Sequence, residues 1–446
     1  MPTKNALPPG PKGTFLLGNL KRFYEQRLDF FYEVAREYGD LASIRFGPRR
    51  IFLASHPDLI EQVLVTDAKH YIKHFGARLY KPVLGNGLVT SEGDFWLRQR
   101  RLSQPAFLKN RVLAYVPVMA DLTQRFVGTW QAGERVDVHD LFNHLTSAIA
   151  LKTLFGLDDS GDRESFVAAL RDAFDLMSLR FRTFYPLPLW LPTGTNRRLK
   201  AAISHLNRVV DGFVAQGRNR PVPGDDLLSR LVAAQDDDGS RMTETQLRDE
   251  AMTLYLAGHE TTALTLSWSW YLLATHPHVE DLLATEWKVV LNGRTPTADD
   301  LTRLPYTDAV IAEAMRVYPP VYLIGREATR DLELGGYRVK KGYTVFMSQW
   351  VSHRDPRYFG PDPDTFRPER WLDGLAKRLP KYAYYPFGGG PRVCIGSAFA
   401  QMEAAIILAA VGQRYRFTLV PDPPVDVTPQ ITLMPKNGIP AVLERR

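Results

Sequence analysis

The sequence predicts a mainly α-helical fold with a small β region, organised as one domain over residues 1–446. Apolar residues recur mainly at intervals of three and four between Asp58 and about Ala215, which is typical of helices. A capping sequence at Thr243 begins a longer helix, which we place at the centre of the domain. Strand-like runs near the start of the chain and after Pro320 indicate the small β region.

Short elements open the chain. Residues 30–38 have the apolar spacing of a helix. Residues 41–47 and 50–54 are runs of strand-forming residues, and Gly47 followed by proline marks a turn between them. This pattern predicts a pair of strands joined by a tight turn.

Three later segments are not helical in pattern. Residues 184–193 contain too many prolines for a helix interior and predict either a packed loop or an apolar lid over a pocket. Residues 236–239 read Asp-Asp-Asp-Gly and predict a solvated turn. After Pro320, glycines at 335–336 and 342 punctuate short strands.

The central helix has clear start and stop signals. Thr243 and Gln246 form a capping box, and Pro277 after His276 ends the helix near residue 275. Some thirty residues make a rod roughly 45–50 Å long, enough to cross a domain. Residues 263–274 are apolar nearly all round, which indicates central burial.

The same stretch does not predict a membrane span. His259 and Glu260 interrupt it, and a charge in mid-membrane is costly. The first residues carry several prolines and no secretory pattern. We therefore expect a cytoplasmic protein without a transmembrane anchor.

Composition excludes several classes of protein. Hydrophobic residues are 45% and charged residues 24% of the 446, which rules out a disordered or fibrous chain. Cys394 is the only cysteine, so no disulfide or multi-cysteine metal cage can form within the chain. The net charge of +7 (56 basic minus 49 acidic residues) is dispersed, and we expect no nucleic-acid partner.

The lone cysteine lies in a glycine-dense loop that reads Phe387-x-x-Gly390-x-Arg392-x-Cys394-x-Gly396, directly before a helical stretch. Glycines let backbone N–H groups approach the sulfur, and a helix N-terminus with a nearby cation favours the thiolate. A thiolate held in this way is a nucleophile or a metal ligand. The spacing does not match a dinucleotide or P-loop motif.

A second motif, residues 257–262, reads Ala-Gly-His-Glu-Thr-Thr within the central helix. A zinc-protease motif is excluded because position 263 is alanine rather than histidine. Ala257, Glu260 and Thr261 fall on one helix face by their spacing. The alternative is a polar kink in which the hydroxyls bond the backbone one turn back.

These motifs resemble those of the cytochrome P450 family of haem-thiolate monooxygenases, and the resemblance covers essentially the whole chain. It implies the family's triangular fold, with the long central helix over haem b. Cys394 would be the iron ligand, and Glu260 and Thr261 would steer protons, with Ala257 and Gly258 beside the oxygen site. A thiolate ligand favours O–O cleavage.

The resemblance also assigns supporting residues. Glu313 and Arg316 form an ExxR pair, which with Arg370 resembles the family's buried structural cluster. The candidate haem-binding residues besides Cys394 and Ala257 are Trp96, Arg100, Arg326, Phe387 and Arg392, of which the arginines and Trp96 would meet the propionates. The distal pocket would be lined by Val89, Val321, Leu323 and Ile324.

The implied activity is insertion of one oxygen atom of O2 into a C–H bond of a hydrophobic small molecule, with fatty acids or terpenoids favoured. The chain is too short for a fused reductase, so an external ferredoxin or flavodoxin, with its reductase, would supply electrons to a monomeric enzyme. We expect Arg98 and Arg101, with Lys377, Arg378 and Lys381, to face solvent and attract an acidic partner. The alternatives are a peroxide-driven or isomerising haem-thiolate enzyme and a non-catalytic haem sensor.

Overall fold

The structure, a computed structural model, describes residues 6–157, 168–170, 172–173, 176–177, 188–218, 224 and 226–446. Contacts group the chain into two units, and each is described by itself below. The first unit comprises Met1–His74, Thr123–Phe142 and Thr261–Arg446, and the second comprises Phe75–Leu122 and Asn143–Glu260. The division falls within the helices α8 (Val116–Val127), α9 (Val138–Phe155) and α13 (Glu244–Thr275).

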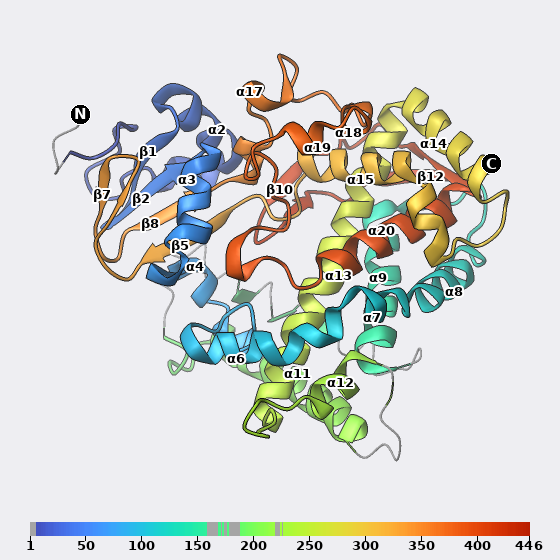
Figure 1. The fold of residues 1–446 in the computed structure, drawn as a ribbon, viewed down its shortest axis with the longest axis horizontal. Helices are drawn as coiled ribbons and strands as arrows, with labels where there is room; N and C mark the ends of the chain where they lie inside the picture. The colour runs from blue at the N-terminus through green and yellow to red at the C-terminus, as the bar shows by residue number, and fades with distance from the viewer. Residues whose placement is uncertain are drawn as a thin grey trace. The chain divides into compact units, whose positions relative to one another are not determined.

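The first unit contains a five-stranded sheet that joins distant parts of the chain (Figure 1). Its order is β1 (Leu41–Phe46), β2 (Arg49–Ala54), β8 (Thr344–Met347), β5 (Ile324–Ala328) and β3 (Tyr71–Lys73). Strands β1 and β2 are antiparallel, with Ile44 opposite Ile51 across a turn at Gly47, which confirms the predicted strand pair. Strand β8 pairs with β2 in parallel and so brings the C-terminal half beside the N-terminal strands.

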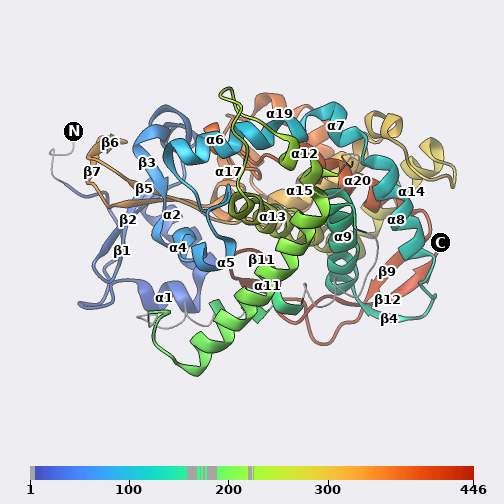
Figure 2. The same ribbon diagram turned by 90° about the horizontal axis from the view of Figure 1, so that it is seen from below.

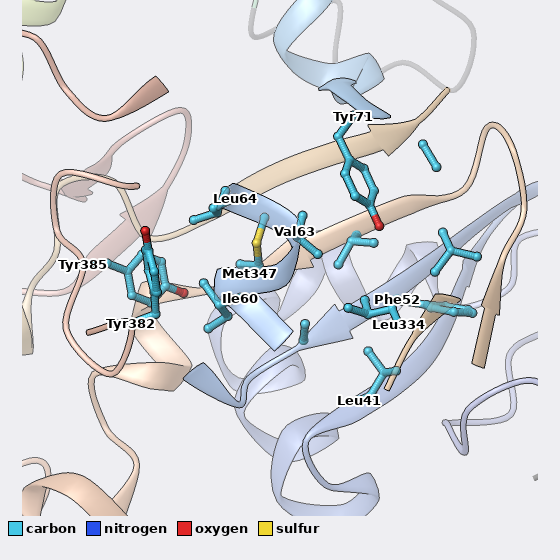
Figure 3. Packing of buried hydrophobic residues seen from close by; sticks show 14 residues of the cluster. Leu41, Phe52, Ile60, Val63, Leu64, Tyr71, Leu334, Met347, Tyr382 and Tyr385 are labelled. Carbon is cyan, nitrogen blue, oxygen red and sulfur yellow. The ribbon is translucent and has the colours of Figure 1, made fainter. Parts of the chain in front are cut away.

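One face of this sheet packs on a cluster of buried apolar side chains (Figure 3). Phe52 and Met347 from the sheet meet Ile60 and Leu64, which come from α3 (Pro57–Glu61) and the following π-helical turn η1 (Gln62–Thr66). Burying one such side chain contributes about 1.5–3 kcal/mol. Tyr382 and Tyr385 belong to the same cluster, so the core reaches the segment that leads to Cys394.

The other helices of the first unit come from both ends of the chain. They are α1 (Leu20–Glu25), α2 (Arg27–Tyr38), α14 (Pro277–Val290), α15 (Pro305–Val317), α16 (Gln349–Ser352), α17 (Pro356–Phe359), α18 (Glu369–Leu372), α19 (Leu375–Arg378) and α20 (Ser397–Gly412). Short 3-10 helices are η2 (Ala68–His70), η4 (Ala298–Arg303) and η5 (Gly390–Arg392). The helix predicted at residues 30–38 is α2.

Three smaller sheets complete the described strands. Strands β4 (Arg135–Asp137), β12 (Pro440–Arg445) and β9 (Tyr415–Leu419) form one sheet, which Figure 2 shows at the C-terminal end. Two-stranded sheets are β6 (Leu332–Leu334) with β7 (Tyr337–Val339), and β10 (Val427–Pro429) with β11 (Leu433–Pro435). The helical prediction for residues 58–215 is wrong at β3 and β4, because these three-residue strands are fixed by partners far along the chain.

The second unit is helical in its described residues. Its elements are α4 (Phe75–Arg78), α5 (Lys81–Leu84), α6 (Gly93–Ser103), η3 (Gln104–Phe107), α7 (Lys109–Leu113), α11 (Gly194–Arg218) and α12 (Leu227–Ala233). The proline-rich segment 184–193 lies partly outside the described residues, which resume at 188. There Asn196 donates to the carbonyls of Pro188 and Leu191, both at 2.9 Å, and Trp190 is exposed.

Helix α13 confirms the predicted start and stop. The Thr243 N–H donates to Gln246 Oε1 at 2.9 Å, and the Gln246 N–H donates to Thr243 Oγ1 at 3.2 Å. Pro277 opens α14 directly afterwards. In the buried half, Ser267 and Ser269 donate to backbone carbonyls one turn back, which satisfies hydroxyls that burial would otherwise penalise. None of the described helices is both long and apolar enough to cross a membrane.

Candidate active site

Cys394 lies in the loop between η5 and α20. Its N–H donates to the carbonyl of Phe387 at 3.0 Å, and the N–H of Val393 donates to the carbonyl of Gly390 at 3.1 Å. These bonds fold the loop back on itself and leave the Cys394 side chain exposed. The sulfur precedes the first turn of α20, where outward-pointing N–H groups favour a negative charge.

The loop rests on tightly packed chain. A Cβ at Gly390 would lie 1.8 Å from the carbonyl oxygen of Leu64, so only glycine allows this approach. Behind it, the N–H of Tyr385 donates to Nε2 of His353 at 3.0 Å. Burial lowers the pKa of His353, with further lowering by Arg316 and Arg354, so the ring is neutral and Nε2 can accept this bond. The loop position is therefore set by the core rather than by the loop alone.

The donor set fits haem. Within the described residues, no group of three or more His, Cys, Asp or Glu side chains is placed to hold a metal ion. A transition metal bound at Cys394 must therefore bring its remaining ligands with it. Haem would do so, because its porphyrin nitrogens already bind the iron and a cysteine thiolate can supply a further ligand.

The start of β5 lies beside the cysteine loop. The Cδ1 atom of Ile324 is 3.4 Å from the position that a Cβ on Gly388 would occupy. Alternate residues of a strand share a face, so Arg326 projects on the same side as Ile324. The Arg326 guanidinium donates to the carbonyl of Gly325 at 3.0 Å. The structure thus places Ile324 against the loop that carries Cys394 and the half-buried Arg392, and Arg326 on the same face of β5.

The other predicted pocket residues differ in their surroundings. Val321 is half-buried, just before β5. Leu323 packs against two buried clusters, one around Phe30 and one around Leu28, so the core covers part of its surface. Val89, in the second unit, is 40% exposed although its neighbours in the loop before α6 are buried.

The Ala-Gly-His-Glu-Thr-Thr motif occupies the middle of α13. Ala257 is exposed, and Gly258, Glu260 and Thr261 are half-buried, whereas the helix is fully buried from residue 262 to 270. His259 is fixed on the other side, since its ring stacks on Tyr255 with centroids 4.5 Å apart and Nδ1 contacts the Tyr255 carbonyl at 2.9 Å. The partly exposed stripe on α13 is therefore the predicted Ala257, Glu260 and Thr261 face.

Helix α6 carries two of the predicted haem-binding residues. Trp96 and Arg100 are four residues apart and so share one face of this helix. Trp96 is buried and Arg100 is half-buried. The spacing can present one cation beside one indole N–H, the two donor types that a propionate accepts.

The Glu313, Arg316 and Arg370 cluster is closed to solvent. Glu313 and Arg316 on α15 are both 0% exposed, and the guanidinium donates twice to the carboxylate at 2.8 Å. Arg370 of α18 donates to Glu313 Oε1 at 2.9 Å, and the Trp371 indole donates to Oε2 at 2.8 Å. Burial lowers the pKa of Arg370, but the Glu313 carboxylate opposes this. Arg316 also donates to the carbonyl of His353, so the cluster holds the segment that supports the cysteine loop.

The expectation that Arg98 faces solvent is wrong, because its side chain is 24% exposed, whereas Arg101 is 57% exposed as expected. Arg98 Nε lies 3.0 Å from Asp236 and its guanidinium donates to Ser240, while Arg101 lies 3.5 Å from Asp236 and 3.6 Å from Asp237. The turn at 236–239 is present, but the Asp236 side chain is only 11% exposed and pairs with both arginines. Lys377, Arg378 and Lys381 are exposed as expected.

Sequence reasoning missed three buried polar residues. They are His353, which accepts from Tyr385, Glu250, which accepts from two neighbouring segments, and Glu403 on α20, whose pKa burial raises to about 8. An isolated acid or histidine in a helical pattern is usually solvated. Only the distant segments packed around these side chains mark them out.

Comparison with known proteins gives a consistent match along the chain. A family model described as Cytochrome P450 matches residues 8–441. The chain is 38% identical over 435 residues to cyclooctatin synthase of Streptomyces melanosporofaciens, covering 95% of this chain and 92% of that protein. It is 35% identical over 433 residues to cyclooctat-9-en-7-ol 5-monooxygenase of the same organism, covering 94% and 93%.

A solved structure shares the fold. The haem domain of cytochrome P450DA aligns with a TM-score of 0.89 at 27% identity, covering 99% of this chain and 98% of that chain. This match confirms the predicted fold class, mainly α with a small β region. Since the family model spans nearly the whole chain, the 446-residue protein belongs to the cytochrome P450 family and is a haem-dependent monooxygenase.

Proposed function

We propose that this protein binds haem b through Cys394 and inserts one oxygen atom of O2 into a C–H bond of a cyclic, terpenoid-class molecule. One observation carries the proposal. The only cysteine of the chain is exposed at the end of a rigidly backed loop, directly before α20, and no protein side chains within the described residues could complete a metal site there. When bound, haem supplies activation of dioxygen at its thiolate-ligated iron.

The protein's own residues would bind and orient the cofactor. Arg326 and Arg392, on β5 and on the cysteine loop, would hold the propionates, with Trp96 and Arg100 of α6 as further donors. Phe387, whose carbonyl accepts the Cys394 N–H, fixes the sulfur in place. Ala257, with no bulk beyond its methyl group, would leave space at the face of α13.

Proton supply would come from α13. Glu260 and Thr261 are half-buried on a helix that is otherwise apolar and buried beyond them. Glu260 would hold a proton at its carboxyl group, and the Thr261 hydroxyl would pass or orient it toward the reacting oxygen. This pair favours a monooxygenase over a peroxide-driven enzyme, an isomerase or a haem sensor, because those activities do not require delivered protons.

The substrate class rests on two supports. Ile324 offers an apolar side chain at the cysteine loop, and Val321 and Val89 would offer further apolar side chains. The relatives are named for cyclooctatin and for cyclooctat-9-en-7-ol, a ring alcohol. We favour a terpenoid of this kind over a fatty acid, because both of these relatives are named for such compounds.

Electrons would come from an external acidic ferredoxin or flavodoxin. Lys377, Arg378 and Lys381 are exposed and lie within twenty residues before Cys394. A positive patch steers an acidic partner and speeds its encounter. Of the two arginines on α6, Arg101 is also exposed, whereas Arg98 is mostly covered and pairs with Asp236.

The test is the ferrous carbon monoxide spectrum of the purified holoprotein. We expect the red-shifted Soret band of thiolate ligation. The Cys394→His variant should still fold but should lack this band. A Soret shift upon titration with terpenoid alcohols, compared with fatty acids, then tests the substrate class. A protein that retains the thiolate band without Cys394 contradicts the assignment.

A further inference from the structure

Two adjacent carboxylates on α13 hold the loop between α5 and α6. The N–H of Asn86 donates to Asp249 Oδ2 at 2.7 Å, and the N–H of Leu88 donates to Glu250 Oε2 at 3.0 Å. On its other oxygen, Glu250 accepts from Gln99 Nε2 of α6 at 3.1 Å. One carboxylate therefore ties α13 to both the loop and the helix that carries Trp96 and Arg100. We call residues 85–91 the clamped loop.

These contacts lie out of water. Glu250 and Gln99 are both 0% exposed, and Leu88 is buried. A buried carboxylate is costly unless hydrogen-bond donors satisfy it. Hydrogen bonds from N–H groups to a carboxylate are stronger than those between neutral groups. Asp249 is nearly as buried and also lies 3.6 Å from Arg248. The clamp is therefore a fixed feature of this unit rather than a surface contact.

The clamp holds the backbone on both sides of Val89. Thr90 Oγ1 donates to the carbonyl of Gly85 at 2.7 Å, and the Thr90 N–H donates to Gly87 at 3.0 Å, which closes the loop on itself. Leu88, Thr90 and their neighbour at 91 are buried, whereas Val89 is 40% exposed. With the backbone held on both sides of it, Val89 has little freedom to move.

We propose that Asp249 and Glu250 are positioning residues that set substrate selectivity. They do so by fixing the clamped loop and α6 against α13, the helix that bears Glu260 and Thr261. The inference rests on the proposed function, in which Val89 lines the pocket. Neither carboxylate touches the reacting atoms in this scheme. Their effect is on which molecule fits, not on the chemistry.

Two substitutions should release the clamped loop by independent routes. Glu250→Leu removes the acceptor for Leu88 and Gln99 while keeping a similar volume. Gly87→Ala leaves the carboxylates intact, but its Cβ would lie 2.2 Å from Thr253 Oγ1 and 2.5 Å from the Asp249 carbonyl, so the loop must lift. Glu250→Gln should be tolerated, because the buried Gln99 Oε1 has no hydrogen-bond partner and can accept from the new amide once Gln99 rotates.

The first measurement is hydrogen–deuterium exchange of peptides that span residues 85–91. We expect Glu250→Leu and Gly87→Ala to speed exchange there by about tenfold or more, since an opened loop loses its protection. Glu250→Gln and Asp211→Asn should leave exchange unchanged. Asp211 is the matched control, because it pairs with the same Arg248 at 3.6 Å without contacting the loop.

The second measurement compares two azole ligands of the haem iron in the holoprotein, imidazole and the larger 4-phenylimidazole. We expect the ratio of their dissociation constants to change about tenfold in Glu250→Leu and Gly87→Ala, and not in Glu250→Gln. Unchanged exchange in both releasing variants overturns the clamp, and faster exchange with an unchanged ratio overturns its role in selectivity. Failure to bind haem through Cys394 would instead overturn the proposed function, and the exchange experiment would still decide the clamp.

Discussion

Arg316 and Glu313 form a two-point ion pair in which neither side chain is exposed to solvent. Arg316 also donates to backbone carbonyls at His353 and Thr365, and its guanidinium lies 5.0 Å from the centroid of the Phe359 ring. The pair therefore joins α15 to three separate segments of the first unit. A buried pair of this kind is costly to break from one side, because the remaining charge is stranded.

We expect Arg316→Ala to destabilise the protein by about 3–5 kcal/mol and to prevent stable haem incorporation. The unfolding midpoint and the haem content per chain measure the two effects. Arg338→Ala is the matched control, since its pair with Asp331 is about half exposed and should contribute at most about 1 kcal/mol. A stable, haem-replete Arg316→Ala protein would contradict the structural role of the cluster.

We expect Thr261→Ala to keep haem and ligand binding while product formed per electron consumed falls about tenfold or more, because proton delivery is impaired. Reducing equivalents should appear as peroxide or water. Ser269→Ala is a control on the same helix, since its hydroxyl already donates to the Thr265 carbonyl at 2.7 Å. If the yield per electron is unchanged, Thr261 has no part in the reaction.

Glu403 should make stability fall as the pH rises. Burial raises its pKa from the ordinary 4.5 to about 8, although Thr262 lowers it somewhat. Between those values the folded protein keeps a proton that the unfolded chain releases, so its stability decreases by about 1.4 kcal/mol per pH unit. Below pH 4.5 both states hold the proton and this loss is absent.

Glu403→Gln cannot titrate, so we expect its unfolding midpoint to gain on the wild type as the pH rises from 4.5 to 8. Thermal unfolding at several pH values measures the difference. The exposed Glu25→Gln variant serves as the control and should follow the wild type. If the unfolding midpoints of wild type and Glu403→Gln change in parallel with pH, the pKa of Glu403 is not raised in the folded protein.

Reversing charge at Lys377 and Lys381 should slow delivery of the first electron by an acidic ferredoxin or flavodoxin and flatten its dependence on salt. Both side chains are exposed, in the segment before the cysteine loop. Stopped-flow reduction at several ionic strengths measures the rate, and the ligand-induced Soret shift should not move. Lys288→Glu, on α14, is the control; equal rates in all variants would place the partner elsewhere.

The sequence by itself determined the elements whose signals are local. The turn at Gly47, the Thr243–Gln246 capping box and the stop at Pro277 depend on neighbouring residues, and each is found where it was predicted. The lone Cys394 in its glycine-dense loop is also a local signal, and it predicts a cofactor that brings its own metal ligands.

Tertiary structure alone decided the roles that depend on partners far along the chain. Strands β3 and β4 have three residues each and exist only through pairing with β5 and β12. Asp236 was expected in a solvated turn, but its side chain is 11% exposed and pairs with Arg98, which was expected to face solvent. Nothing in the sequence distinguishes Glu250 from a solvent-exposed acid on a helix. Its role depends on Leu88 and Gln99, which the fold brings within hydrogen-bond distance. Local patterns fix the backbone of one segment, but burial and hydrogen-bond partners are properties of segments brought together by the fold.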